Sequence, residues 1–332
     1  MKLITKSEFF CLGLCLILFS AFSCKNGTKS EENEETEIDT LRTIEPFYKL
    51  SLAQWSLHKA IEEEKTLSNL DFAQKAKELG FEGIEYVSQL YILEEGNEQA
   101  SLDSLVVELK KRSEEHGVQN VLIMIDKEGD LAVSNKEDRD EAIRKHSMWI
   151  DAAAKLGCSS VRVNLSGGEA EKDVIQWYAN AVDGLGRLAA YGATKNINVI
   201  VENHGGLSSE ADKVAAVLKE INLSNCGTLP DFGNFCIVGS SSDQWKSPCE
   251  KTYDRYKGME ELLPFAKGVS AKSYTFDEQG NEETIDYFKM MKIVKDSGYK
   301  GFIGVEYEGS ILTEEEGILA TKALVIKAAE NL

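Results

Sequence analysis

Hydrophobic and polar positions alternate between two patterns eight times along the chain. Short runs of β-branched and aliphatic residues, typical of buried strands, are each followed by a longer segment with apolar residues at helical spacing. A helix is expected at 70–79, for example. Strands are expected at 49–58, 83–88, 119–126, 159–165, 198–204, 227–233, 268–276 and 301–308.

Glycines mark where several of these helices end. Gly80, Gly117, Gly157 and Gly298 each lead into an expected strand, and glycine supplies the left-handed conformation that ends a helix. Eight strand-then-helix units within residues 46–332 favour one closed (β/α)₈ barrel, a fold that typically takes about 250 residues. The connection at 235–257 is long, so we expect either part of an active-site wall or lid, or a packed surface excursion.

The N-terminal segment indicates an exported protein. Lys2 and Lys6 precede an apolar run at 9–22 that is too short to span a membrane, as in a signal peptide. Because 19–24 resembles a lipobox, we expect a lipoprotein signal at 1–24, with Cys24 lipidated and anchoring the chain on the periplasmic or cell-surface side; an incidental cysteine after an ordinary signal is the alternative. Residues 25–45 are rich in glutamate and predict a flexible acidic linker.

Charge and cysteine content narrow the partners and the compartment. The formal net charge of −19 repels phosphate backbones, so nucleic acid is not expected as a partner, and the membrane is expected to be contacted only through the lipid anchor. The oligomeric state is left open. An oxidising compartment would permit disulfides, and their pairing is also left open among Cys158, Cys226, Cys236 and Cys249.

Polar residues gather at the carboxyl ends of the expected strands, where a barrel holds its chemistry. Residues two apart in a strand point the same way, so Gln54, Ser56 and His58 are expected on one face. The same rule pairs Arg162 with Asn164, Glu202 with His204, Ser270 with Lys272, and Glu306 with Glu308, and Glu85 and Asp231 complete the set. His116 and His146 fall in helical segments and are expected to be solvated.

Five motifs carry a family resemblance. They are Leu52-Ala53-Gln54-Trp55-Ser56-Leu57-His58, Gly83-Ile84-Glu85, Val201-Glu202-Asn203-His204-Gly205-Gly206, Pro230-Asp231-Phe232-Gly233-Asn234 and Gly304-Val305-Glu306-Tyr307-Glu308-Gly309. In their order and spacing, the chain resembles the sugar phosphate isomerase/epimerase group of xylose isomerase-like barrels over residues 49–328.

The resemblance implies a divalent metal held by acids on strands five, six and eight and a histidine on strand seven. Glu202, Asp231 and Glu306 match the acids, but Ser270 stands at the histidine position with Lys272 beside it. Two alternatives follow. The three carboxylates hold Mn²⁺ or Mg²⁺, with His204 as a further candidate ligand, or the lysine ammonium partly replaces the cation.

For function, the resemblance implies a sugar isomerase or epimerase that moves a proton next to a carbonyl through an enediolate. Glu202 or Glu306 would be the base, while His204, His58 and Lys272 would bind or protonate oxygens. The sugar or keto-sugar would be bound by Gln54, His58, Glu85, Arg162, Asn164 and Asn234. A keto-sugar dehydratase or lyase and a non-catalytic carbohydrate-binding barrel remain as alternatives, and His204 could instead only orient a hydroxyl.

Overall fold

The computed structural model describes residues 46–239, 249–330 and 332. The described residues belong to one compact unit. The expected signal, Cys24 and acidic linker lie outside the described residues. No helix within the described part of the chain is long and apolar enough to cross a membrane.

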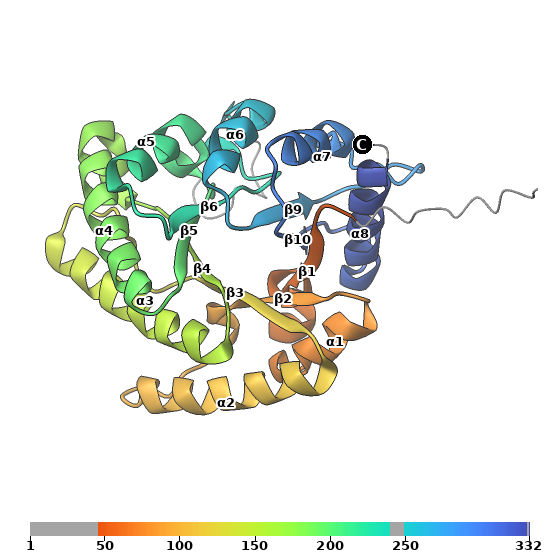
Figure 1. Ribbon diagram of the computed structural model, residues 1–332, viewed down its shortest axis with the longest axis horizontal. Coiled ribbons are helices and arrows are strands. Elements are labelled where there is room, and N and C mark those ends of the chain that lie inside the picture. Colours follow the sequence, from red (N-terminus) through yellow and green to blue (C-terminus); the bar gives the residue numbers. More distant parts are fainter. Residues whose placement is uncertain (1–45, 240–248, 331) are drawn as a thin grey trace, which may run out of the picture. The chain divides into compact units, whose positions relative to one another are not determined.

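Eight parallel strands form the barrel, as the alternating pattern predicts (Figure 1). Their order is β6-β5-β4-β3-β2-β1-β10-β9. Two isolated parallel bridges, Thr228–Ala266 and Asp231–Ser270, close the barrel between β6 and β9. The strands are β1 (Lys49–Ala53), β2 (Gly83–Val87), β3 (Gln119–Ile125), β4 (Ser160–Val163), β5 (Asn198–Glu202), β6 (Cys226–Leu229), β9 (Val269–Ser273) and β10 (Phe302–Tyr307).

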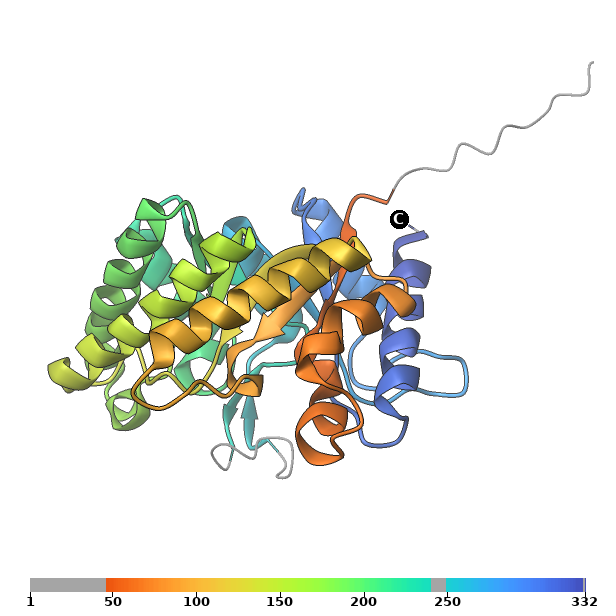
Figure 2. The same ribbon diagram turned by 90° about the horizontal axis from the view of Figure 1, so that it is seen from below.

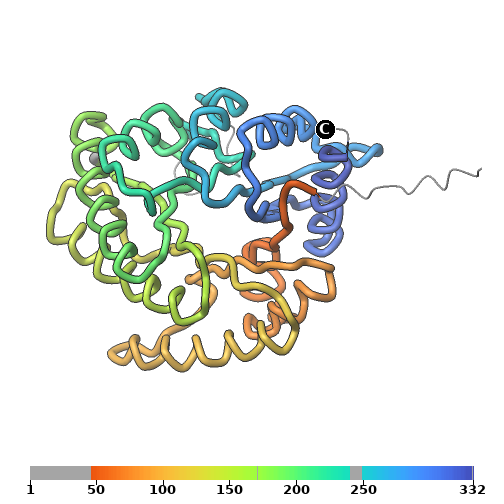
Figure 3. The backbone as a smooth tube through the Cα atoms, in the orientation of Figure 1, coloured from red at the N-terminus to blue at the C-terminus, as the bar shows by residue number. Residues whose placement is uncertain are grey.

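Helices surround the strands (Figure 1, Figure 3). Apolar side chains of helices and strands are buried together in the core. Side-chain caps start several helices: Asn135 accepts from two backbone N–H groups of α3, and Asp173 does the same for α4. The expected glycine ends are confirmed, since Gly117 and Gly157 follow α2 and α3 with φ of 62° and 83°. The helices are α1 (Phe72–Glu78), α2 (Glu98–His116), α3 (Lys136–Leu156), α4 (Val174–Thr194), α5 (Ala211–Ile221), α6 (Arg255–Leu262), α7 (Tyr287–Asp296) and α8 (Glu314–Glu330).

The first strand is shorter than the sequence pattern predicts. β1 ends at Ala53, and residues Gln54–Leu57 form a 3₁₀ helix. The expectation that Gln54, Ser56 and His58 share one strand face is therefore wrong, because the alternation of side chains holds only in extended backbone. His146 corrects a second expectation: it is buried rather than solvated, and its Nδ1 lies 2.7 Å from the carbonyl oxygen of Ala142.

The long connection after β6 begins with an antiparallel hairpin of β7 (Cys236–Val238) and β8 (Lys251–Thr252). A disulfide between Cys236 and Cys249 ties its two strands, and Cys158 and Cys226 are free and buried. The hairpin projects from the lower end of the barrel as drawn in Figure 2.

Candidate active site

Three acids from the β5, β6 and β10 segments meet at one end of the barrel. Glu202 ends β5, Asp231 follows β6 by two residues, and Glu306 lies within β10. All three side chains are buried, and each offers an oxygen within 4.8 Å of the others. The barrel register brings them together, because Asp231 pairs with Ser270 of β9 and Glu306 pairs with Lys272.

The residues on β9 occupy the space between these acids. Ser270 Oγ lies 2.6 Å from Asp231 Oδ2 and 3.1 Å from Glu306 Oε2, so its single hydrogen binds one carboxylate at a time. Lys272 Nζ lies 3.4 Å from Glu306 Oε2 and 3.3 Å from Glu308 Oε1. Serine thus links two acids where the resemblance led us to expect a histidine, and lysine brings a positive charge beside them.

Glu202 is held from the opposite side. Asn234 Nδ2 donates a hydrogen bond to Glu202 Oε1 over 2.8 Å, and Arg162 Nε lies 2.9 Å from Glu202 Oε2. Arg162 Nη1 also donates to Asp126 Oδ1 over 2.7 Å, and Asn164 Nδ2 donates to the same oxygen over 2.8 Å. The carboxylate of Glu202 is therefore oriented by a buried guanidinium and a buried amide.

Burial has the largest effect on the pKa values of the acids that face the barrel interior. It raises the pKa of both Asp231 and Glu306; the Lys272 ammonium opposes these shifts, and the charge of Glu202 adds to them. Burial alone would lower the pKa of Lys272, but Glu306 and Glu308 hold that pKa well above its ordinary value. These acids thus resist ionising together, and a cation close to them would favour their charged forms.

Glu85 lies in the interior at the level of β1 and β10. Ser51 Oγ donates to Glu85 Oε1 over 2.6 Å, while Glu85 Oε2 is buried and has no hydrogen-bond partner among the described residues. Gly304 makes room for this side chain, since a Cβ on residue 304 would lie 2.5 Å from Glu85 Oε1. Burial raises the pKa of Glu85 to about 7, with the Ser51 hydrogen bond opposing the shift.

The residues present fit a divalent cation. Among the described residues, six acids lie in or at the mouth of this interior, with the two cations Arg162 and Lys272 beside them. Glu202 Oε2 accepts no hydrogen bond from the described residues, although Arg162 is near it. Carboxylate oxygens are the donors that Mg²⁺ and Mn²⁺ prefer. The six acids are Glu85, Asp126, Glu202, Asp231, Glu306 and Glu308.

The structure brings together most of the residues that the sequence pattern selects. Arg162, Asn164 and Asn234 contact the acids or one another directly, but three other candidates do not join the cluster. Gln54 donates to Tyr91 Oη and accepts from the backbone N–H of Val87.

Two of the candidates outside the acid cluster are histidines. His58 stacks on Trp55, with ring centroids 4.5 Å apart, and its Nδ1 lies 3.7 Å from Glu314. His204 follows β5 and is half-buried. Among the described residues, the group of side chains able to share a metal consists of the three acids and contains neither histidine.

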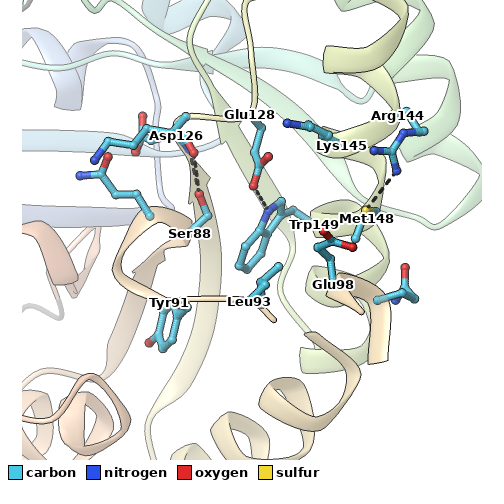
Figure 4. Close-up of a pocket in the computed structure, with 13 residues that line it drawn as sticks. Ser88, Tyr91, Leu93, Glu98, Asp126, Glu128, Arg144, Lys145, Met148 and Trp149 are labelled. Carbon is cyan, nitrogen blue, oxygen red and sulfur yellow. Dashed lines mark hydrogen bonds between the residues drawn. The ribbon is translucent and has the colours of Figure 1, made fainter. Parts of the chain in front are cut away.

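Asp126 is the member of the site that the sequence analysis does not select. It directly follows β3, and Arg162 holds its pKa below the ordinary value although burial acts in the opposite direction. An acid immediately after the apolar run of β3 is the signal that would have identified it. Asp126 also borders a cavity of about 470 Å³ between β3 and α3, whose wall includes Trp149 donating to Glu128 (Figure 4).

A second cavity, of about 610 Å³, is lined in part by residues of the site. It extends from Asn234 and Glu308 to the β7–β8 hairpin and the start of α6, and both disulfide cysteines line it. The described part of the long connection after β6 therefore forms part of a cavity wall.

Comparison with known proteins identifies similar sequences and folds. The family model described as xylose isomerase-like TIM barrel matches residues 73–329. No curated protein sequence matches the chain.

Solved structures of three kinds of protein share the fold at low identity. L-ribulose 3-epimerase is 15% identical, with a TM-score of 0.64 over 86% of this chain and 95% of that one. IOLI protein with a binding zinc atom is 14% identical, with a TM-score of 0.60 over 85% and 98% of the two chains. The probable 3-DHS dehydratase from Bacillus anthracis is 17% identical, with a TM-score of 0.56 over 84% and 98%.

Proposed function

The chain belongs to the family of xylose isomerase-like TIM barrels, and on that premise we propose that it is a sugar isomerase or epimerase. It would move a proton at the carbon next to a sugar carbonyl. The observation that carries the proposal is the meeting of Glu202, Asp231 and Glu306 within 4.8 Å at the carboxyl ends of the strands. The similarity to an epimerase of known structure agrees with it.

The two glutamates differ in their surroundings, as an acid and a base must. Glu202 is paired with Arg162 and accepts a hydrogen bond from Asn234, so its carboxyl group is fixed in position. Burial raises the pKa of Glu306, which favours its protonated form. We assign proton removal to Glu202 and the return of a proton on the other face to Glu306, which begins the reaction protonated.

Lys272 and Ser270 complete the site. The Lys272 ammonium is 3.4 Å from Glu306 and can neutralise its charge or donate a proton to a sugar oxygen. Ser270 keeps Asp231 and Glu306 at hydrogen-bonding distance from one oxygen. Glu202, Asp231 and Glu306 would hold a divalent ion, which would supply positive charge to the carbonyl and hydroxyl oxygens of the substrate.

A lyase remains the second candidate, because a dehydratase shares the fold and the same proton removal precedes loss of a neighbouring group. Product analysis separates the two reactions. An isomerase or epimerase returns a sugar of unchanged mass, whereas a lyase releases water or a glycosyl group.

The test is solvent-deuterium incorporation into a panel of ketoses and 3-keto sugars, with and without Mn²⁺. We expect exchange that is lost in Glu202→Gln and in Glu306→Gln. Glu314→Gln is the matched control, since Glu314 is a half-buried acid that contacts the backbone of Lys59 and Ala60 rather than the cluster. Saturable sugar binding without exchange would instead support a carbohydrate-binding protein.

We also propose that the protein is exported and lipid-anchored through Cys24. The disulfide between Cys236 and Cys249 supports an oxidising compartment. A Cys24→Ala variant should move from the membrane fraction to the soluble fraction of the cell envelope. Unchanged fractionation would contradict the anchor.

A further inference from the structure

We propose that the substrate is a neutral glycoside of a keto-sugar, whose second sugar ring occupies the cavity beneath the β7–β8 hairpin. This inference rests on the proposed function, since it takes the reacting sugar to lie over Glu202, Asp231 and Glu306. It concerns the chemical class of the substrate, and it excludes a phosphorylated sugar.

The cavity is contiguous with the acid cluster through two shared side chains. Asn234 donates to Glu202, and Glu308 lies 3.3 Å from Lys272, yet both also line the cavity of about 610 Å³. Asn234 Oδ1 and Glu308 Oε2 are buried and accept no hydrogen bond from the described residues. These two acceptors lie between the acid cluster and the cavity. A ligand that extends from one to the other and bears hydroxyl groups could donate hydrogen bonds to both.

The cavity wall combines aromatic faces with hydroxyl groups. Tyr253 and Tyr256 line it and are each half-buried. Aromatic rings offer an apolar face together with a polar edge, a combination suited to the C–H faces and hydroxyl rims of a pyranose. The cavity is lined by none of the three acids, so whatever fills it extends beyond the reacting carbons.

Charge decides between a sugar ring and a phosphate. Among the described lining residues, the acids are Asp254 and Glu308 and the cation is Arg255. Asp254 already caps α6 by accepting from the backbone N–H groups of Tyr256 and Lys257. Arg255 Nη1 is buried and has no hydrogen-bond partner among the described residues, so it can donate to a ligand oxygen. A phosphate at this guanidinium would also lie near two lining carboxylates in a protein of net charge −19, which disfavours it relative to a neutral sugar.

Binding of a matched set of fructose derivatives tests the proposal. The ligands are D-fructose, fructose 6-phosphate, and three glucosyl-fructoses linked through O3, O4 or O6. Dissociation constants are measured by titration calorimetry on the purified protein, both in chelator and with Mn²⁺. We expect at least one disaccharide to bind ten times more tightly than fructose, and the phosphate to bind no more tightly than fructose.

Two variants test whether the cavity causes the tighter binding of a disaccharide. Ser310→Trp fills the cavity from an exposed position, and Tyr256→Leu removes an aromatic face; each should abolish the tenfold preference while fructose binding stays within twofold. Ser224→Trp, at an exposed position that precedes β6 and lies outside the cavity, is the matched control and should leave all constants unchanged.

The outcomes separate this inference from the proposed function. Disaccharides that bind no more tightly than fructose, equal weakening of both sugars in Ser310→Trp, tighter binding of the phosphate, or no binding of any sugar would each overturn the glycoside proposal. A disaccharide preference without deuterium exchange would refute the isomerase and leave the second sugar site standing.

Discussion

Replacing Glu85 with glutamine should stabilise the protein at neutral pH and have little effect in acid. The side chain is 1% exposed, and burial raises its pKa to about 7 from an ordinary value of 4.5. Below pH 4.5 the carboxyl is protonated in both the folded and the unfolded chain. Between pH 4.5 and 7 only the folded chain keeps the proton, so the free energy of unfolding of the wild type falls as the pH rises.

The size of the effect follows from the two pKa values. At about 1.4 kcal/mol per pKa unit, a shift from 4.5 to about 7 corresponds to about 3 kcal/mol once the pH exceeds 7. About half of this loss in the free energy of unfolding of the wild type should be present near pH 6. Glutamine carries no charge at any of these pH values and preserves an acceptor for the Ser51 hydroxyl. The free energy of unfolding of the variant should therefore increasingly exceed that of the wild type as the pH rises.

Urea denaturation followed by tryptophan fluorescence measures this difference at intervals from pH 4.5 to 8.5. Chelator is present throughout, because a bound cation would change the ionisation of the neighbouring acids. Glu82→Gln, at an exposed position one residue before β2, is the control and should change the free energy by less than about 0.5 kcal/mol. A difference between Glu85→Gln and wild type that stays constant with pH would refute the reasoning.

Three further substitutions test the surroundings of the acids. Ser270→His adds an imidazole at the position between Asp231 and Glu306, so we expect Mn²⁺ affinity, measured by titration calorimetry, to rise about tenfold; an unchanged affinity would contradict the assignment of this position. Lys272→Met removes a buried cation and should lower the free energy of unfolding by about 3–5 kcal/mol in chelator, with Mn²⁺ restoring part of the loss in thermal melts. Gly304→Ala should cost about 1–3 kcal/mol, and less when Glu85 is also changed to alanine; equal costs in both backgrounds would show that Glu85 is not the obstacle.

The barrel itself could be predicted because each local signal agrees with the fold. Gly117 and Gly157 end helices in the left-handed conformation, and the apolar runs of β3 and β5 are buried as strands. The acids on β5 and β10 could be placed because strand ends in a parallel barrel lie at one edge. These inferences needed only short-range patterns.

The details that the sequence pattern missed depend on tertiary contacts. Gln54 lies outside the strand that the pattern predicts. Its side-chain amide forms hydrogen bonds with Tyr91 and with the backbone of Val87, which are both distant in sequence. Asp126 belongs to the site because Arg162 reaches it from the next strand. His146 is buried by helix packing that hydrophobic periodicity does not encode. Each of these positions is decided by a partner that could not be identified from local patterns.

The closure of the barrel has a practical consequence. Among the described residues, β6 and β9 pair through isolated bridges rather than a continuous ladder, and one bridge, between Asp231 and Ser270, lies inside the acid cluster. A ligand that holds these two residues together also holds the two ends of the sheet together. At a concentration one hundred times its dissociation constant, such a ligand would add about 2.7 kcal/mol to the stability of the folded state. A melting-temperature screen of sugars and metal ions could therefore find the natural ligand before its reaction is known.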